Sequence, residues 1–248
     1  MIIWLRSLLF NIVFYSFSLC LCIAVLPCLL LPRAVTLFIT RLYVRIVSLL
    51  EELILGLSCE IRGRENLPES GAYIVAAKHQ SAYETLKLHC LFDDPSIILK
   101  QELLHIPFWG WFLGKLDPIA IDRSDKEGAM VSIIKGALRV KDQGRPIVIF
   151  PQGTRVHPHA TTEEKPYKGG IIKMYNATKL PIIPMALNTG LFWEKNSFLK
   201  KPGRVVLEFL PAIEPGLPEK KVMKALEDRL ELNSLRLMNE ARERNPAL

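Results

Sequence analysis

A long uncharged run near the N-terminus sets the first limit on how this chain can fold. From Ser7 to Pro32 there is no Asp, Glu, Lys or Arg, and Leu, Ile, Val and Phe dominate. A helix needs about 20 apolar residues to cross the hydrocarbon core of a bilayer, so this run is long enough. It begins like a signal peptide, but it is too long for one and lacks a small-residue cleavage site before Arg33. We therefore expect an apolar helix that remains on the chain.

A second apolar stretch, from Ala34 to Leu57, differs from the first because it carries charges. Arg41 and Arg45 are four residues apart and share one face of a helix, which predicts a basic stripe on an otherwise apolar rod. Such a helix suits the headgroup level of a bilayer or contact with a single partner helix. Two helices hinged at Pro32 would form a membrane anchor that enters one leaflet and returns. A true span by the first helix is the alternative.

The next segment, Ser58 to Ser70, is polar and contains Gly63 and Pro68, which are typical of a boundary. We predict an anchor over residues 1–57 and a main domain over residues 58–248.

Composition narrows the class of protein. Half of the 248 residues are hydrophobic and 23% are charged, which is unlike a disordered chain. The net charge of +7 suits an anionic membrane or a phosphorylated substrate. No signature of a nucleic-acid-binding module is present, so we expect no nucleic-acid partner. The five cysteines form neither a disulfide framework nor a zinc pattern, which favours a reducing, cytoplasmic setting for the main domain.

Short apolar runs alternate with helical patterns through the main domain. Strands are predicted at residues 59–62, 73–77, 96–99, 116–121, 146–150, 180–187 and 205–210. The alternation predicts an α/β fold with a mixed, mostly parallel sheet flanked by helices. A charged helix from Glu219 to about Arg244 follows, with one apolar stripe formed by Val222, Leu226, Leu230, Leu237 and Met238.

Local signals refine this outline. Ser81 and Glu84 have the spacing of an N-cap hydroxyl and an N3 carboxylate, and Ser124 and Glu127 repeat it, so a helix should begin at each serine. Pro184 argues for an irregular or edge strand, because proline cannot donate a ladder hydrogen bond.

The turn after the strand at residues 73–77 carries His79, with Glu84 five positions later. An imidazole moves protons near neutral pH, and a nearby carboxylate fixes its tautomer. Across a short turn the two side chains can touch. The alternatives are a loop histidine with no chemical role and a glutamate that only caps the helix.

Cationic residues follow three other predicted strands. Lys100 ends the strand at residues 96–99, Arg123 follows the strand at 116–121, and Arg155 ends the loop Pro151-Gln152-Gly153-Thr154-Arg155. Ligands gather at the carboxyl ends of strands in open α/β sheets, and arginine can hold a phosphate through two parallel hydrogen bonds. Each cation alone also fits a surface role, as a solvated lysine or a loop salt bridge.

Four blocks occur in a fixed order: the histidine and acid at 79–84, Ile119-Ala-Ile-Asp-Arg123, Phe150-Pro-Gln-Gly-Thr-Arg155 and Leu180-Pro-Ile-Ile-Pro184. Together they resemble the glycerolipid acyltransferases, most closely the 1-acylglycerol-3-phosphate acyltransferases (PlsC-like). The likeness covers about residues 60 to 215.

This resemblance implies an O-acyltransferase in which His79 and Glu84 are catalytic. It implies that Lys100, Arg123, Gln152, Gly153, Thr154 and Arg155 bind the substrate. The acceptor would be lysophosphatidate and the product phosphatidic acid, with acyl-CoA or an acyl carrier protein as acyl donor and no further cofactor. The main domain would then be a catalytic domain facing the cytoplasm, with the anchor in the inner, cytoplasmic membrane.

Two positions depart from the family pattern, which usually has aspartate in place of Glu84 and glutamate in place of Gln152. The alternative functions are an acyltransferase for another acceptor, such as glycerol 3-phosphate or a lyso-amino-lipid, and a lipid hydrolase with Ser81 as nucleophile. No Gly-x-Ser-x-Gly elbow is present to support the hydrolase.

His157 and His159 alternate in a polar segment, but no third ligand has suitable spacing. We predict a polar loop there and no metal site.

Overall fold

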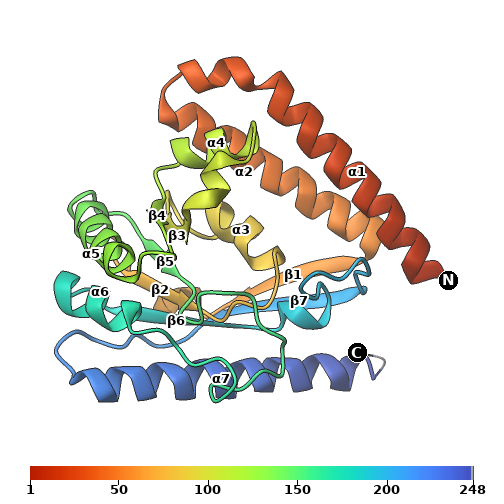
Figure 1. The fold of residues 1–248 in the computed structure, drawn as a ribbon. Helices are drawn as coiled ribbons and strands as arrows, with labels where there is room; N and C mark the ends of the chain where they lie inside the picture. Colours follow the sequence, from red (N-terminus) through yellow and green to blue (C-terminus); the bar gives the residue numbers. More distant parts are fainter. Residues whose placement is uncertain (247) are drawn as a thin grey trace.

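One central sheet organises the molecule (Figure 1). Within residues 1–246 and 248, which the computed structural model describes apart from the Lys126 side chain, seven strands pair in the order β1-β7-β6-β2-β5-β3-β4. Every neighbouring pair is parallel except β6 with β7. The predicted mixed, mostly parallel sheet is confirmed. The strands are β1 (Leu57–Arg62), β2 (Ile74–Ala77), β3 (Ser96–Lys100), β4 (Ile119–Ile121), β5 (Ile147–Ile149), β6 (Ile182–Leu187) and β7 (Gly203–Phe209).

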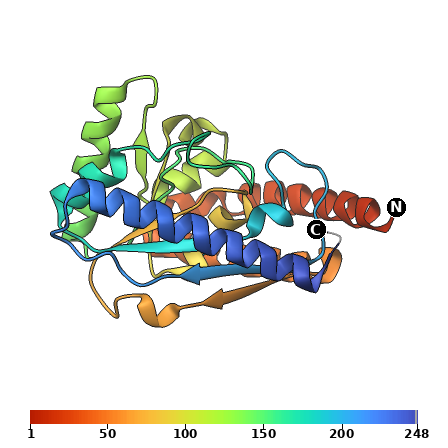
Figure 2. The ribbon, with the colours of Figure 1, turned by 90° about the horizontal axis from the view of Figure 1, so that it is seen from below.

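Helices cover both faces of this sheet. Alternate residues of β2 point to opposite faces: Val75 belongs to the core cluster that includes Phe10 of α1 and Tyr83 of α3, whereas Ile74 belongs to the cluster with Ala137 of α5 and Leu226 of α7. Figure 2 shows α7 running across the sheet. The helices are α1 (Ile2–Ala24), α2 (Arg33–Leu50), α3 (Tyr83–Leu91), α4 (Trp109–Lys115), α5 (Lys126–Asp142), α6 (Gly170–Thr178) and α7 (Glu219–Arg244).

The prediction of an edge position for Pro184 is wrong, because β6 lies between β7 and β2. Antiparallel pairing with β7 begins at Met185, and the carbonyl of Pro184 accepts a hydrogen bond from Leu210 N just beyond the end of β7. In a strand the N–H and C=O of one residue point to the same side. The donor that proline lacks therefore faces Leu210, so only a bond at the end of the pairing with β7 is missing and the bonds within the ladder remain.

The helix starts also differ from the predicted caps. At α5 the N-cap is Asp125, whose carboxylate accepts from Gly128 N, while Ser124 donates to Asp122 instead. At α3 the helix begins after Ala82. The carboxylate of Glu84, the acid of the expected capping box, nevertheless accepts a hydrogen bond of 2.8 Å from Ser81 N.

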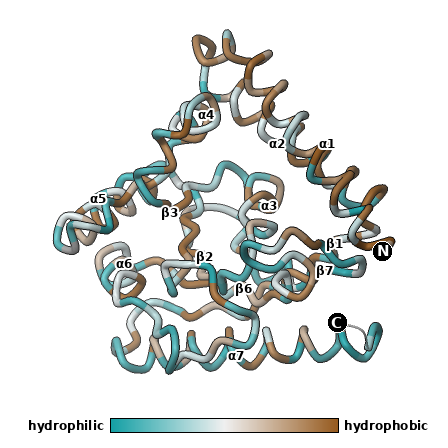
Figure 3. Tube along the Cα trace, turned by 45° about the vertical axis from the view of Figure 1, so that its right-hand side comes forward, coloured by the Kyte–Doolittle hydropathy of each residue, from teal (hydrophilic) through white to brown (hydrophobic). Residues whose placement is uncertain are grey.

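The two N-terminal helices pack antiparallel along one side of the molecule and are joined by a short 3-10 turn, Leu26–Leu30. Among the described helices, α1 is the one that is long and apolar enough to cross a membrane. Its apolar character continues through the turn (Figure 3), whereas α7 is largely hydrophilic. The predicted pair of apolar helices is thus present, with its bend spread over the segment that ends at Pro32.

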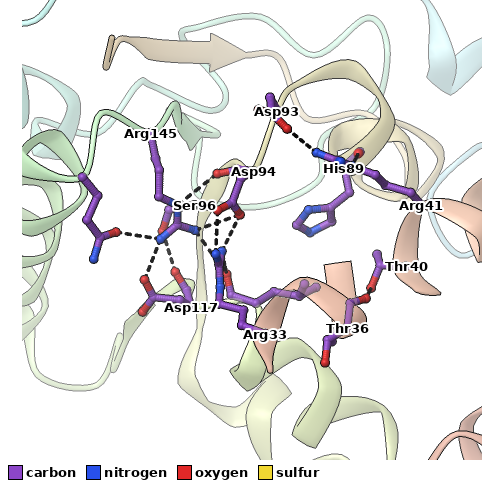
Figure 4. Close-up of polar contacts among 12 residues, drawn as sticks. Arg33, Thr36, Thr40, Arg41, His89, Asp93, Asp94, Ser96, Asp117 and Arg145 are labelled. Atoms are coloured by element: carbon purple, nitrogen blue, oxygen red, sulfur yellow. Dashed lines mark hydrogen bonds and ion pairs between the residues drawn. The ribbon is translucent and has the colours of Figure 1, made fainter. Parts of the chain in front are cut away.

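Helix α2 is fastened to the sheet domain by charged contacts at its start (Figure 4). Arg33 donates to both carboxylate oxygens of Asp94 and to Leu116 O, while Arg145 donates to Asp94 O and to Asp117 Oδ2. Arg33 therefore holds the loops before β3 and β4 against α2, and Arg145 joins the same two loops to the segment before β5.

Candidate active site

The predicted site residues gather at one edge of the sheet. Strands β2, β5, β3 and β4 are consecutive and parallel, so their carboxyl ends lie at the same edge. His79 follows β2, the segment 152–155 follows β5, Lys100 ends β3 and Arg123 follows β4. Neighbouring strands are about 4.8 Å apart, so loops from adjacent strands can act on one ligand.

His79 and Glu84 are in direct contact. Nδ1 of His79 lies 2.8 Å from Oε1 of Glu84, whose side chain is fully buried, while the His79 side chain is 16% exposed. The same oxygen accepts from the backbone N–H groups of Gln80 and Ser81, each at 2.8 Å. A carboxylate that accepts from three donors leaves Nδ1 as the protonated nitrogen, and Nε2 then carries the free lone pair. No described residue hydrogen-bonds to Nε2.

The other oxygen of Glu84 is held from a distant strand. Oε2 accepts a hydrogen bond of 2.8 Å from Oγ1 of Thr189, which lies just beyond the carboxyl end of β6. Both carboxylate oxygens are therefore fixed, which locks the carboxylate plane and with it the direction of the imidazole. Sequence reasoning missed Thr189. The signal was present, because a polar Asn-Thr pair follows a buried strand there.

The loop after β5 packs against His79. The Phe150 ring stacks on the imidazole with centroids 4.1 Å apart. His79 N donates to Oε1 of Gln152 at 3.2 Å, and His79 O accepts from Val156 N at 2.8 Å. Gln152 is only 3% exposed, and its Nε2 has no hydrogen-bond partner among the described residues. The amide thus supports the histidine turn through one of its two polar atoms.

Gly153 shows why this loop tolerates no side chain at that point. Its φ is +69°, and a Cβ there would lie 3.0 Å from both Cε and Nζ of Lys168. Lys168 therefore lies against the loop and adds a cation that sequence reasoning did not single out. Its only sequence signal was a lysine beside two glycines, which is weak.

The predicted cations differ in how they are held. Arg123 donates through Nη1 to Gly153 O, which joins the loops after β4 and β5, and burial lowers the pKa of its guanidinium. Arg155 is half-buried, and no described residue pairs with its guanidinium. Lys100 is exposed at the end of β3, and Thr154 is exposed in the loop; neither side chain has a described partner. Three of these side chains are therefore uncommitted.

Other chemistry considered from the sequence finds less support. Ser81 is fully buried, and its hydroxyl accepts from Tyr83 N, so it is not presented as a nucleophile. His159 contacts Arg242 through Nε2 at 2.7 Å, and His157 pairs with Glu194 at 3.4 Å. Among the described residues no group of three His, Cys, Asp or Glu side chains is arranged to hold a metal.

The fold and this edge define a class: an α/β protein whose histidine, oriented by a buried carboxylate, stands beside cationic loops. Comparisons with known proteins agree. The family model described as Acyltransferase matches residues 58–188. The 1-acyl-sn-glycerol-3-phosphate acyltransferase of Pseudomonas aeruginosa is 37% identical over 176 residues, which cover 71% of this chain and 67% of that protein. The chain belongs to the acyltransferase family.

Two further comparisons bear on extent and fold. The yeast Saccharomyces cerevisiae protein of the same name is 33% identical over 138 residues, which cover 55% of this chain and 45% of the yeast protein. The crystal structure of the 1-acyl-sn-glycerophosphate (LPA) acyltransferase PlsC from Thermotoga maritima superposes with a TM-score of 0.76. It covers 94% of this chain and 96% of that chain at 22% identity, so it supports the fold over nearly the full length.

Proposed function

We propose that this protein transfers an acyl group from an acyl thioester to the free sn-2 hydroxyl of 1-acylglycerol 3-phosphate, giving phosphatidic acid for phospholipid biosynthesis. The relatives named above carry this activity in their names. The observation that carries the proposal is the contact of 2.8 Å between His79 Nδ1 and Glu84 Oε1, which leaves Nε2 without a described partner.

In the mechanism that we infer, Nε2 of His79 takes the proton of the acceptor hydroxyl as that oxygen attacks the thioester carbonyl. The buried Glu84 carboxylate stabilises the imidazolium that forms. When the carbon–sulfur bond breaks, the imidazolium gives the proton to the departing thiolate. One ester forms and one thioester is lost, without a covalent acyl-enzyme. Holding the two substrates together supplies much of the remaining rate enhancement.

We further propose that the phosphate of the acceptor binds at the loops after β3, β4 and β5. Lys100 and Arg155 have no described partners there, and Arg123 and Gly153 fix the loop between them. Gln152 would act through the turn it supports, while Thr154 is exposed beside Arg155. A phosphate held by these cations would direct the neighbouring hydroxyl toward His79.

The acceptor and the product of the proposed reaction are both membrane lipids, so we place the protein at a membrane. The apolar surface of α1 supports this: Leu9, Ile12 and Leu19 are all more than half exposed, which is costly in water. We infer that residues 1–57 anchor the protein in the cytoplasmic membrane and that the catalytic edge faces the cytoplasm, where acyl-CoA or an acyl carrier protein supplies the acyl group.

The test is acyl transfer by the full chain in detergent micelles. His79→Ala should lower the rate with lysophosphatidate about 10³-fold, the scale of general base catalysis, and the matched control His105→Ala, which removes an exposed histidine, should not change it. Residual turnover above a tenth of the wild-type rate would remove His79 from the mechanism. The wild-type enzyme should prefer lysophosphatidate over monoacylglycerol, and equal use of the two would refute the phosphate site.

A further inference from the structure

A cavity lies away from the catalytic edge, between α2, α3 and β1. Its volume is about 530 Å³, and it shares no lining residue with the site around His79. Its walls combine basic side chains, Arg41, Arg45 and Lys87, with apolar ones, Ile61 and Phe92. A cavity with one cationic part and one apolar part matches the two halves of an anionic lipid.

The three cations are not equally available. Lys87 Nζ is 2.5 Å from Glu51 Oε2 in a buried pair, and Arg41 Nη2 is 2.5 Å from Asp93 Oδ1, a carboxylate that is 94% exposed. Arg45 is exposed and has no ion pair or hydrogen bond with any described residue. One guanidinium of the cavity therefore lacks a counter-charge, and a second is paired only at the surface.

The three positive charges act on the same small space. Burial raises the pKa of the Cys90 thiol, which also lines the cavity, while the charges of Arg45, Lys87 and Arg41 oppose that rise. The cavity is thus electropositive at its α2 side.

The position of Arg45 on α2 connects the cavity with the apolar surface. Successive residues turn about 100° around a helix, so the exposed side chains of Phe38, Leu42 and Leu49 lie within about 40° of one another. Arg45 is about 40° from their mean direction, on the side toward Arg41. Arg45 therefore lies between the apolar stripe of α2 and the cavity. When the stripe lies in lipid, a basic side chain at this position is at the level of the headgroups.

We propose that this cavity binds the phosphate headgroup of an anionic phospholipid of the membrane, held between Arg41 and Arg45, with the acyl chains along the exposed stripe of α2. The site is distinct from the acceptor site and does not depend on the reaction proposed above. It would bind the protein to anionic membranes in one orientation, with α2 at the surface.

The first experiment compares binding of the full chain to vesicles of phosphatidylcholine alone or mixed with phosphatidylglycerol. Arg45→Glu removes one positive charge and adds one negative charge, so it should weaken binding to the mixed vesicles by about 30-fold, which corresponds to about 1 kcal/mol for each of the two charge units. Binding to neutral vesicles should not change. Lys221→Glu, the same charge change on α7 across the sheet (Figure 1), is the matched control and should bind like wild type. An equal effect of the two variants would overturn the proposal, as would wild-type binding by Arg45→Glu.

A second experiment reports on the cavity itself. Cys59 and Cys90 are exposed and line it, so their reaction with a maleimide can be followed in a chain whose other three cysteines are serine. Short-chain phosphatidylglycerol should slow labelling several-fold, whereas short-chain phosphatidylcholine should not, and Arg45→Glu should abolish the protection. Equal protection by inorganic phosphate alone would mean that the cavity binds a free anion and not a lipid. Absence of protection by phosphatidylglycerol would refute the site. Unchanged thermal unfolding of Arg45→Glu would establish that the variant is folded.

Discussion

At the scale of single residues, the proposed catalytic pair of His79 and Glu84 is built by the turn that carries it. Glu84 receives hydrogen bonds from two backbone N–H groups and from the imidazole of His79, all within a six-residue segment. Only the bond from Thr189 comes from elsewhere. A glutamate has one methylene more than an aspartate, and in this turn its carboxylate still reaches the imidazole. The geometry of the pair is thus set locally and secured from one distant strand.

Gln152 gives a test of how charge near this pair matters. Its Oε1 accepts from His79 N, and its Nε2 has no partner in the part of the chain that the structure describes, so Gln152→Glu would lose no hydrogen bond seen there. It would add a buried negative charge that stabilises imidazolium. We expect the acid limb of the pH profile of kcat/KM to move to higher pH by about one unit. The measurement is acyl transfer from pH 5 to 9.

Gln152→Leu serves as the control for that variant. It removes the acceptor for His79 N without adding charge, so activity should fall because the turn is less well held, while the acid limb should stay in place. An unchanged profile for Gln152→Glu would mean that this side chain does not act on the imidazole electrostatically.

At the scale of elements, the contact between α2 and α3 encloses a histidine that has no part in the proposed mechanism. His89 is 6% exposed, and no described residue forms a hydrogen bond with its Nδ1. It lies between Arg41 and the Arg33–Asp94 pair (Figure 4). Burial lowers the pKa of His89 to about 4; Arg41, Arg33 and Arg145 act in the same direction and Asp94 opposes them. The histidine is therefore neutral in the folded protein at pH 7.

This pKa predicts a loss of stability in mild acid. The unfolded chain takes up a proton on His89 near its ordinary value of 6.5, but the folded chain does so only near pH 4. Stability from the neutral form is full above pH 6.5 and decreases as the pH falls toward 4. Between pH 7 and 5 the loss in the free energy of unfolding from this residue is about 2 kcal/mol. Urea unfolding of His89→Leu should show a pH 7 to 5 decrease smaller by that amount, whereas His105→Leu, at an exposed position, should keep the wild-type decrease. Equal decreases in all three proteins would contradict the assignment.

The elements also show what the sequence could and could not predict. Short continuous apolar runs located all seven strands, and the rule that ligands gather at strand carboxyl ends placed Lys100, Arg123 and Arg155 at one edge. Strand order is not encoded in any local pattern, so the central position of Pro184 could not be seen until its partner strand was known to end there. Thr189 and Lys168 were missed for a related reason, because each acts through a contact with a residue far away in sequence.

At the scale of the whole molecule, the N-terminal helices are part of the core as well as a candidate anchor. Phe10 is fully buried with its ring 5.5 Å from Trp193, and Ser7 Oγ accepts from Lys200 N at 2.9 Å. Lys87 has its buried counter-charge in Glu51. The division at residue 57 remains a prediction about membrane contact. In folding, however, the two parts are not independent, because the contacts of Ser7, Phe10 and Glu51 join residues 1–57 to the rest of the chain.

Removal of residues 1–57 should therefore unfold the remaining chain instead of releasing a soluble enzyme. The truncation removes Phe10 and Leu55, which are both buried in the core, and uncovers the apolar side chains beneath them. Burial of one large apolar side chain contributes about 1.5 to 3 kcal/mol, so the loss is a large part of the stability of a typical domain. We expect residues 58–248 to lack a cooperative urea transition and a near-UV circular dichroism signal in mild detergent. The full chain with Leu9, Ile12 and Leu19 changed to Gln is the matched control, since these side chains are exposed: it should unfold cooperatively yet bind vesicles weakly. A cooperative transition for residues 58–248 at the wild-type midpoint would show that the helices only tether the domain, and the buried contacts of Phe10 and Glu51 would then contribute little to its stability.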